Sequence, residues 1–228
     1  MSRAFPWQNF LSLWLFALCL GLMEAAVVVY LRALGLPGGS ELSQLHGLLH
    51  GVDTRLLWVE QQRELATLVL LLVPAYLFSV RFSYRLLSYI LCFGAWDLAY
   101  YVFLKGFLAW PERWTVLDVL FLVPRPWIAP VLCPVLISAG MVLFASVYLL
   151  LSRTRVVRSP HLAAWFALIA GGVLVLYAFM GQTGEYQRAT DKLPQFAWAW
   201  FGAGYGLMAV AACWMLIQHY REPKARFF

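Results

Sequence analysis

Six long apolar runs restrict this chain to one kind of fold. They cover residues 10–33, 60–79, 84–107, 130–151, 162–180 and 196–218, and each is bounded by charge, glycine or proline. A helix needs about 20 apolar residues to cross the ~30 Å hydrocarbon core of a bilayer. Hydrophobic residues make up 63% of the chain and charged residues 12%, which excludes an ordinary soluble domain. We predict a single all-α membrane domain over residues 1–228, a polytopic bundle of about six transmembrane helices.

The basic residues predict how this bundle is oriented. Lysine and arginine exceed aspartate and glutamate by 17 to 11, for a formal net charge of +6. Short basic segments flank alternate ends of the runs, at Arg3, Arg81, Arg85, Arg153, Arg155, Arg158, Arg221, Lys224 and Arg226. Such segments stay in the cytoplasm under the positive-inside rule. The charge surplus therefore predicts cytoplasmic termini, and it gives no reason to expect a nucleic-acid partner.

The segment before the fourth run differs from an ordinary connection. Residues 105–129 include WTVLDVLFLV, which is too short to cross a bilayer, followed by PRPWIAP. Proline rings disfavour helix in the residues before them. We predict an interfacial or re-entrant segment that leads into the fourth helix.

Carboxylates inside the apolar runs are the first candidates for a functional site. Glu24 and Asp97 would each cost on the order of 2.5–3.5 kcal/mol if they faced lipid, so they should face the bundle interior. Counted along their helices, both lie in the outer half of the bilayer, where Glu64 of the second run can join them. We predict a catalytic group of Glu24, Asp97, Glu64 and Tyr101. Neighbouring polar residues are the candidate ligand-binding groups: Arg32, Arg63, Tyr100 and Lys105.

Two other interpretations of these carboxylates stay open. Glu24 and Asp97 could serve only to neutralise Arg32, Arg63 or Lys105 and so fix the helices in register. A divalent metal is a further alternative, because His46 and His50 have the i, i+4 spacing that places two imidazoles on one helical face, with Glu64 as a third ligand. Gly47 and Gly51 weaken the metal hypothesis, since they disfavour a stable helix there.

The glycines of the last two runs suggest helix packing and no nucleotide site. FGAGYG at 201–206 lies inside an apolar run with no preceding strand, so it does not resemble a phosphate-binding loop. The spacing of Gly202 and Gly206 is the small-xxx-small pattern that lets membrane helices approach closely. We expect the same of Gly171 and Gly172.

Four strings in the first two thirds of the chain, MEAAVVVYLR, RELATLVLLL, WDLAYYVFLK and LDVLFLVPRPWIAPVLCP, carry a family resemblance. They are similar to an uncharacterised family of small polytopic bacterial inner-membrane proteins. The resemblance implies a bacterial inner-membrane location but no activity, substrate or cofactor. It also implies a set of motif positions: Glu24, Arg32, Glu64, Asp97, Tyr101 and Asp118. Of these, Asp118 is added to the candidate ligand-binding residues.

Three functions are compatible with these features. The first is binding, with chemical transformation, of a lipid-like or isoprenoid-like molecule that enters from the bilayer, with Glu24 and Asp97 as an acid and base pair. The second is proton- or cation-coupled transport through the same carboxylates. The third is a non-catalytic role as a subunit beside partner proteins in a larger membrane complex.

Overall fold

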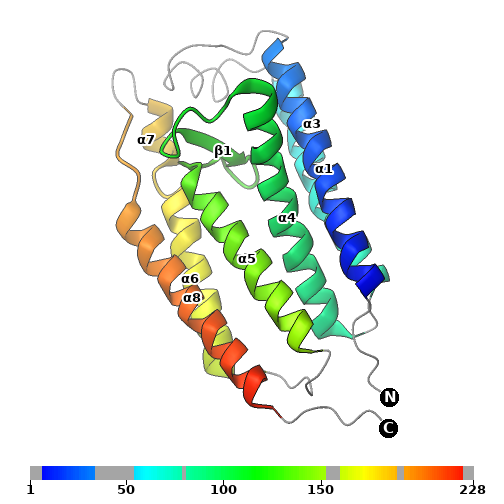
Figure 1. Cartoon of the computed structure of the whole chain (residues 1–228). Helices are drawn as coiled ribbons and strands as arrows, with labels where there is room; N and C mark the ends of the chain where they lie inside the picture. Colours follow the sequence, from blue (N-terminus) through cyan, green and yellow to red (C-terminus); the bar gives the residue numbers. More distant parts are fainter. Residues whose placement is uncertain (1–6, 34–53, 79–80, 153–159, 189–192, 223–228) are drawn as a thin grey trace.

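The computed structural model describes residues 7–33, 54–78, 81–152, 160–188 and 193–222, which form a helical bundle with one small sheet (Figure 1). The long helices are α1 Trp7–Ala33, α3 Thr54–Leu77, α4 Phe82–Leu108, α5 Leu132–Leu151, α6 Leu162–Met180 and α8 Trp198–Arg221. A short helix and two strands complete the described elements: α7 Thr183–Arg188, β1 Leu117–Phe121 and β2 Trp127–Pro130. The predicted helical class is confirmed.

Five of the long helices, α1, α4, α5, α6 and α8, are long and apolar enough to cross a membrane. Helix α3 is equally long, with 24 residues, but its first half holds Glu60, Arg63 and Glu64. These charges lower its apolarity below that of the others. Length and composition therefore identify five spanning helices among the described residues, one fewer than the sequence predicts.

The long helices form two groups that meet along α4 and α5. The first helix group consists of α1, α3 and α4, which pack on one another, and the second consists of α5, α6 and α8, in which α8 packs on both α5 and α6. The first residue of α1 and the last residue of α8 lie at the same end of the bundle, and the sheet lies at the other (Figure 1). We call this other end the hairpin end.

Two glycines set the crossings that place the predicted carboxylates. A Cβ at Gly21 of α1 would lie 2.7 Å from Ala99 Cβ of α4, and one at Gly94 of α4 would lie 2.7 Å from the Ser138 carbonyl oxygen of α5. Larger residues would therefore force these helices apart. Because Gly21 and Gly94 each precede an acid by three residues, Glu24 and Asp97 lie one turn closer to the hairpin end than these crossings.

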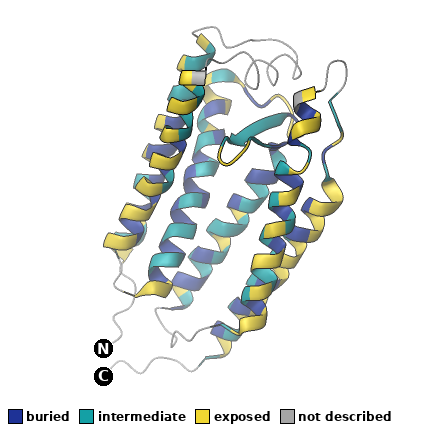
Figure 2. Ribbon diagram, turned by 180° about the vertical axis from the view of Figure 1, so that it is seen from behind, coloured by how far each residue is buried: buried dark blue, intermediate teal, exposed yellow. Residues whose placement is uncertain are grey.

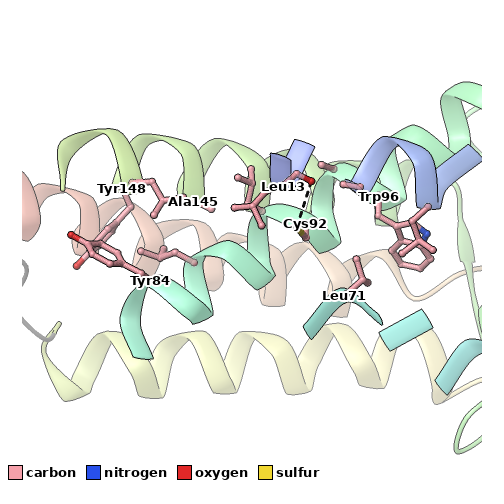
Figure 3. Close-up of a cluster of buried hydrophobic side chains, with 13 residues drawn as sticks. Leu13, Leu71, Tyr84, Cys92, Trp96, Ala145 and Tyr148 are labelled. Atoms are coloured by element: carbon pink, nitrogen blue, oxygen red, sulfur yellow. Dashed lines mark hydrogen bonds between the residues drawn. The ribbon is translucent and has the colours of Figure 1, made fainter. Parts of the chain in front are cut away.

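Apolar side chains from both groups fill the interior between α1, α3, α4 and α5. The buried cluster drawn in Figure 3 contains Leu13, Leu71, Cys92 and Ala145, and the Cys92 thiol donates to the Leu13 carbonyl oxygen at 3.6 Å. Trp96 closes the cluster at the hairpin end. The polar residues described below therefore lie above a dry apolar core.

Helices α6 and α8 approach closely, but through only one of the glycines that the sequence suggests. A Cβ at Gly171 would lie 2.6 Å from the Gly204 carbonyl oxygen. A Cβ at Gly172, Gly202 or Gly206 would meet nothing within 4 Å among the described residues. The predicted packing role is confirmed for Gly171 and is wrong for Gly172, Gly202 and Gly206 within this bundle.

The segment before α5 is a β-hairpin. Strands β1 and β2 pair antiparallel, with Leu117 opposite Pro130, Asp118 opposite Ala129 and an irregularity between Val119 and Phe121. Branched and aromatic residues favour extended backbone here, and the prolines of the turn and of β2 disfavour helix. The two strands lie across the end of the bundle opposite to the marked termini, as Figure 2 shows from behind.

The alternation of side chains along the hairpin gives it two covered faces. Val119 and Ile128 pack against Tyr186 of α7 on one face, and Trp127 and Ala129 pack against the second helix group on the other. The Thr183 hydroxyl of α7 also donates to the Pro126 carbonyl oxygen at 2.8 Å. The hairpin is therefore held between α7 and the bundle.

Candidate functional site

Most of the predicted site residues lie on α1, α3, α4 and β1 near the hairpin end. We call this set the polar cluster: Glu24, Arg32, Glu60, Arg63, Glu64, Asp97, Tyr100, Tyr101 and Asp118. It contains five carboxylates and two guanidinium groups. The structure joins them through several separate hydrogen-bonded pairs.

Glu24 is held by α3 and has no free oxygen to act as the predicted base. It forms an ion pair with Arg63, and its Oε1 accepts from the Thr67 hydroxyl at 2.5 Å. The Arg63 Nε also donates to Glu60 Oε2 at 2.9 Å. Glu24 is only 7% exposed. The Arg63 guanidinium and the Thr67 hydroxyl together occupy both oxygens of this buried carboxylate, so the arrangement matches the structural interpretation of Glu24.

Glu64 connects α3 to the hairpin. Its Oε2 accepts from the backbone N–H of Leu122, directly after β1, at 2.8 Å, and the residue is 8% exposed. The bond satisfies a donor in the turn of the hairpin, which has no partner within the sheet. Glu64 therefore fixes the position of β1 against the first helix group.

Asp97 faces the second helix group. The Ser138 hydroxyl of α5 donates to its Oδ2 at 2.8 Å. The side chain is half-buried. Asp97 and Glu24 thus have different partners on different helices, and the structure shows no direct contact between them among the described side chains.

Asp118 is the carboxylate that the hairpin brings to α4. The Tyr101 hydroxyl donates to its Oδ2 at 2.9 Å, and the Val119 backbone N–H donates to its Oδ1 at 3.0 Å. Burial raises the pKa of Asp118 to about 6, although both hydrogen bonds and the positive charge of Arg32 act in the opposite direction. Asp118 therefore changes its protonation state close to neutral pH.

Tyr100 is the meeting point of the polar cluster. Its hydroxyl interacts electrostatically with Asp97, Asp118, Arg32 and Arg63. Asp97 and Asp118 also interact with each other, as like charges. The ring of Tyr100 lies edge-on to that of Tyr101 with 5.0 Å between centroids. The centre of the cluster therefore combines two carboxylates and two phenols.

Arg32 and Lys105 have partners other than carboxylates. The Arg32 guanidinium carbon lies 4.8 Å from the centroid of the Trp110 ring, which stacks on Tyr101. The Lys105 ammonium donates to the carbonyl oxygens of Ala109 and Pro111, where α4 ends. Lys105 thus caps the helix, as cations at helix C-termini do.

The metal hypothesis gains no support from the geometry. His46 and His50 lie outside the described residues. Within the described part of the chain, no three histidine, cysteine, aspartate or glutamate side chains gather closely enough to hold an ion. Glu24, Glu64 and Asp97, which the sequence places in one layer, do not form such a group.

Several site residues were missed by sequence reasoning. Thr67 lies one turn from Arg63 and Glu64, so the helical period could have indicated it. Ser138 lies in an uncharged helix, and only the crossing at Gly94 brings it to Asp97. Comparisons with protein-family models, with curated proteins and with solved structures found no match.

Proposed function

We propose that this chain is an integral protein of a bacterial inner membrane in which all six long helices cross the bilayer. An even number of crossings agrees with α1 beginning and α8 ending at the same end of the bundle (Figure 1). The basic segments flank that end, so we assign it, with both termini, to the cytoplasm. The hairpin end then faces outward, with the hairpin in the outer interfacial region.

The charges of α3 are compatible with a crossing helix. Arg63 pairs with Glu24 and Glu60, and Glu64 accepts a backbone hydrogen bond from Leu122. Ionisable residues in membranes typically pair with one another or face the protein interior, which lowers the cost of insertion. All three charges also lie toward the hairpin end of α3, close to the proposed interface.

We propose that the polar cluster binds, and transforms by acid–base chemistry, a lipid-like or isoprenoid-like molecule that enters from the bilayer. The observation that carries this proposal is the contact of Asp118 with Tyr101 beside Asp97. Two interacting carboxylates favour a state in which one holds a proton and the other is ionised, which supplies a proton donor and a proton acceptor in one site. Tyr101 orients Asp118 through its hydroxyl group.

The assignment of roles differs from the sequence hypothesis at one position. Glu24 is neutralised by Arg63 and Thr67, so we assign it to positioning α3, and Asp118 replaces it as the partner of Asp97. Glu64 likewise positions the hairpin. Proton donation at one atom of the ligand and removal at another needs no cofactor, so the protein's own groups balance this step.

The test is lipid co-purification from the host membrane. We would purify the wild type and the Asp97→Asn, Asp118→Asn and Glu24→Gln variants in mild detergent, and identify bound lipids by mass spectrometry. We expect a specific lipid to be depleted at least tenfold in both aspartate variants and retained in Glu24→Gln, provided that each variant stays folded. Equal lipid profiles in all four folded proteins would refute the proposal.

Two further measurements separate the alternative functions. Proton or cation flux into proteoliposomes that requires Asp97 would establish transport in place of binding. A stoichiometric partner protein in the purified sample, together with unchanged lipid content in the aspartate variants, would establish a non-catalytic subunit.

A further inference from the structure

Two tryptophans beside the polar cluster, the buried Trp96 of α4 and the partly buried Trp127 of β2, have buried indole N–H groups with no hydrogen-bond partner among the described residues. Both rings pack on Phe121 of β1, with centroid distances of 6.5 Å for Trp96 and 5.2 Å for Trp127. Trp96 is 8% exposed, and Figure 3 shows its nitrogen on the side of the ring toward the hairpin end. Buried donors normally have partners, so this pair indicates an acceptor supplied by a ligand.

These donors lie next to the central carboxylates. Trp96 directly precedes Asp97 in α4, and Phe121 follows Asp118 by three residues in β1. A strand advances about 3.3 Å per residue, so the two ends of this stretch are about 10 Å apart. A small head group with several polar atoms can therefore reach both the indole donors and the carboxylate acceptors.

The cations of the region have partners within the protein. Arg63 is held by Glu24 and Glu60, Lys105 by two backbone carbonyl oxygens, and Arg32 lies over the Trp110 ring. The polar cluster has five carboxylates against two guanidinium groups. A phosphate would meet repulsion from the carboxylates, and the Arg32 guanidinium, which lies over the Trp110 ring, already attracts the Asp118 carboxylate.

The hydrogen-bond donors and acceptors of the site further restrict the class of head group that can bind. A phosphate diester, or a phosphate monoester once it is doubly ionised, only accepts hydrogen bonds, so it cannot donate to an ionised carboxylate. An ammonium group only donates, so it cannot satisfy the indole N–H groups. A hydroxyl group does both.

We propose that the polar cluster takes a lipid whose head group is uncharged and carries several hydroxyl groups, such as a glycosyl group on a diacylglycerol. Its hydroxyl groups donate to Asp97 and Asp118 and accept from Trp96 and Trp127. This inference rests on the proposed function and names its ligand class.

The test compares lipids that differ only in their head groups. The full chain in detergent would be titrated with monoglucosyl diacylglycerol, phosphatidic acid and a diacyl lipid with a primary ammonium head group, all with the same acyl chains, and binding would be followed by native mass spectrometry. Diacylglycerol measures the contribution of the tails. We expect the glucosyl lipid to bind at least about tenfold more tightly than either charged lipid, because only its head group can satisfy both donors and acceptors.

Two conservative variants test the indole donors. Trp96→Phe and Trp127→Phe keep an aromatic ring and remove one N–H each, and each should weaken binding of the glucosyl lipid about threefold to tenfold. Affinity for phosphatidic acid should not change. Trp200→Phe, on the exposed side of α8, is the matched control and should leave all affinities unchanged.

The failures of the two proposals are distinguishable. Tighter binding of either charged lipid, or unchanged glucosyl-lipid affinity in both tryptophan variants while folded, overturns the inference. The proposed function survives that result if lipid binding still depends on Asp118. If neither Asp97→Asn nor Asp118→Asn alters the binding of any lipid, the proposed function fails and the inference fails with it.

Discussion

The two helix groups hold their helices together by different means. In the first group, α1, α3 and the hairpin are joined through Arg63, Glu24 and Glu64. In the second group, α5 and α6 contain no charged residue, and α6 meets α8 through direct contact of Gly171 with Gly204. Both groups contain a glycine crossing, at Gly21 in the first and at Gly171 in the second, but among the described residues only the first group adds ion pairs.

This difference follows from the physics of membranes and bears on function. Apolar side chains gain little from meeting each other in lipid, so helices associate through polar bonds or through close van der Waals packing. The second group is packed mainly through apolar and backbone contacts, with hydrogen bonds from Tyr205 to the Leu136 carbonyl oxygen and between Ser152 and His219 joining α8 to α5. It carries no candidate for chemistry on α5 or α6 apart from Ser138. The first group contributes nearly all of the ionisable residues, so the second serves as the support against which the polar cluster is held.

The largest effect should come from breaking the ion pairs of the first group. Arg63→Met leaves Glu24 and Glu60 without their cation, and we expect a loss of about 3–5 kcal/mol in the free energy of unfolding. Equilibrium unfolding in mixed micelles measures this loss. Arg113→Met, in the exposed connection before β1, is the matched control and should change stability by less than about 0.5 kcal/mol.

A second variant shows whether the loss is due to the stranded charge. Adding Glu24→Gln to Arg63→Met removes one unpaired carboxylate, so the double variant should be more stable than Arg63→Met alone. If the two substitutions are simply additive, the ion pair does not hold this group together and the contrast between the groups is lost.

The second group should respond to volume and not to charge. Gly171→Ala places a Cβ 2.6 Å from the Gly204 carbonyl oxygen and 2.6 Å from Met208 Cγ, so α6 and α8 must separate. We expect a loss of about 1–3 kcal/mol, as for other overpacked sites, measured by the same unfolding experiment. Gly172→Ala, one position along and facing open space, should be neutral. Equal losses in both variants would show that the contact with α8 is not responsible, because helix propensity alone favours alanine over glycine at both positions.

The sequence was sufficient to predict the helices but not the hairpin. Hydropathy identifies long apolar runs because lipid tolerates few charges, and that rule locates every long helix within several residues of its bounds. It was least informative for α3, where four charged residues lower the apolarity, Arg55, Glu60, Arg63 and Glu64. The hairpin was not predicted, because LDVLF is compatible with either a buried helix or a strand, and only its pairing with WIAP distinguishes them.

The candidate site was predictable in its charges but not in its partners. The cost of burying carboxylates points to Glu24 and Asp97 without a structure. Which side of a helix each faces depends on crossings at Gly21 and Gly94, and residue types alone do not specify these crossings. For the same reason, the orphan donors Trp96 and Trp127 resemble any other tryptophan of an interfacial belt in the sequence.

Removing the hydrogen bond between the two helix groups should lower the free energy of unfolding by less than the substitutions within either group. Ser138→Ala removes the hydroxyl that α5 donates to Asp97, and we expect a loss of about 1–2 kcal/mol. Ser12→Ala on the exposed side of α1 is the control, because its hydroxyl bonds only to its own helix. A loss no larger than that of the control would mean that the groups are joined by apolar packing alone.

The last prediction concerns the pH dependence of stability that Asp118 of the hairpin contributes. Because burial raises the pKa of Asp118 to about 6, above its usual value near 4, the folded state binds more protons than the unfolded state between these values. Stability should therefore fall as pH rises from about 4 to 6 and become independent of this group above that range. Asp118→Asn should remove this slope, so that the thermal midpoint of the variant rises relative to that of the wild type as pH increases across the window. Glu112→Gln, which removes an exposed carboxylate in the same connection, is the control and should show the same change of thermal midpoint with pH as the wild type.

The opposite result would be a thermal midpoint of Asp118→Asn that falls relative to the wild type as pH rises. It would mean that the hydrogen bonds from Tyr101 and Val119 and the charge of Arg32 outweigh burial. Asp118 would then be ionised throughout this pH range and unable to donate a proton.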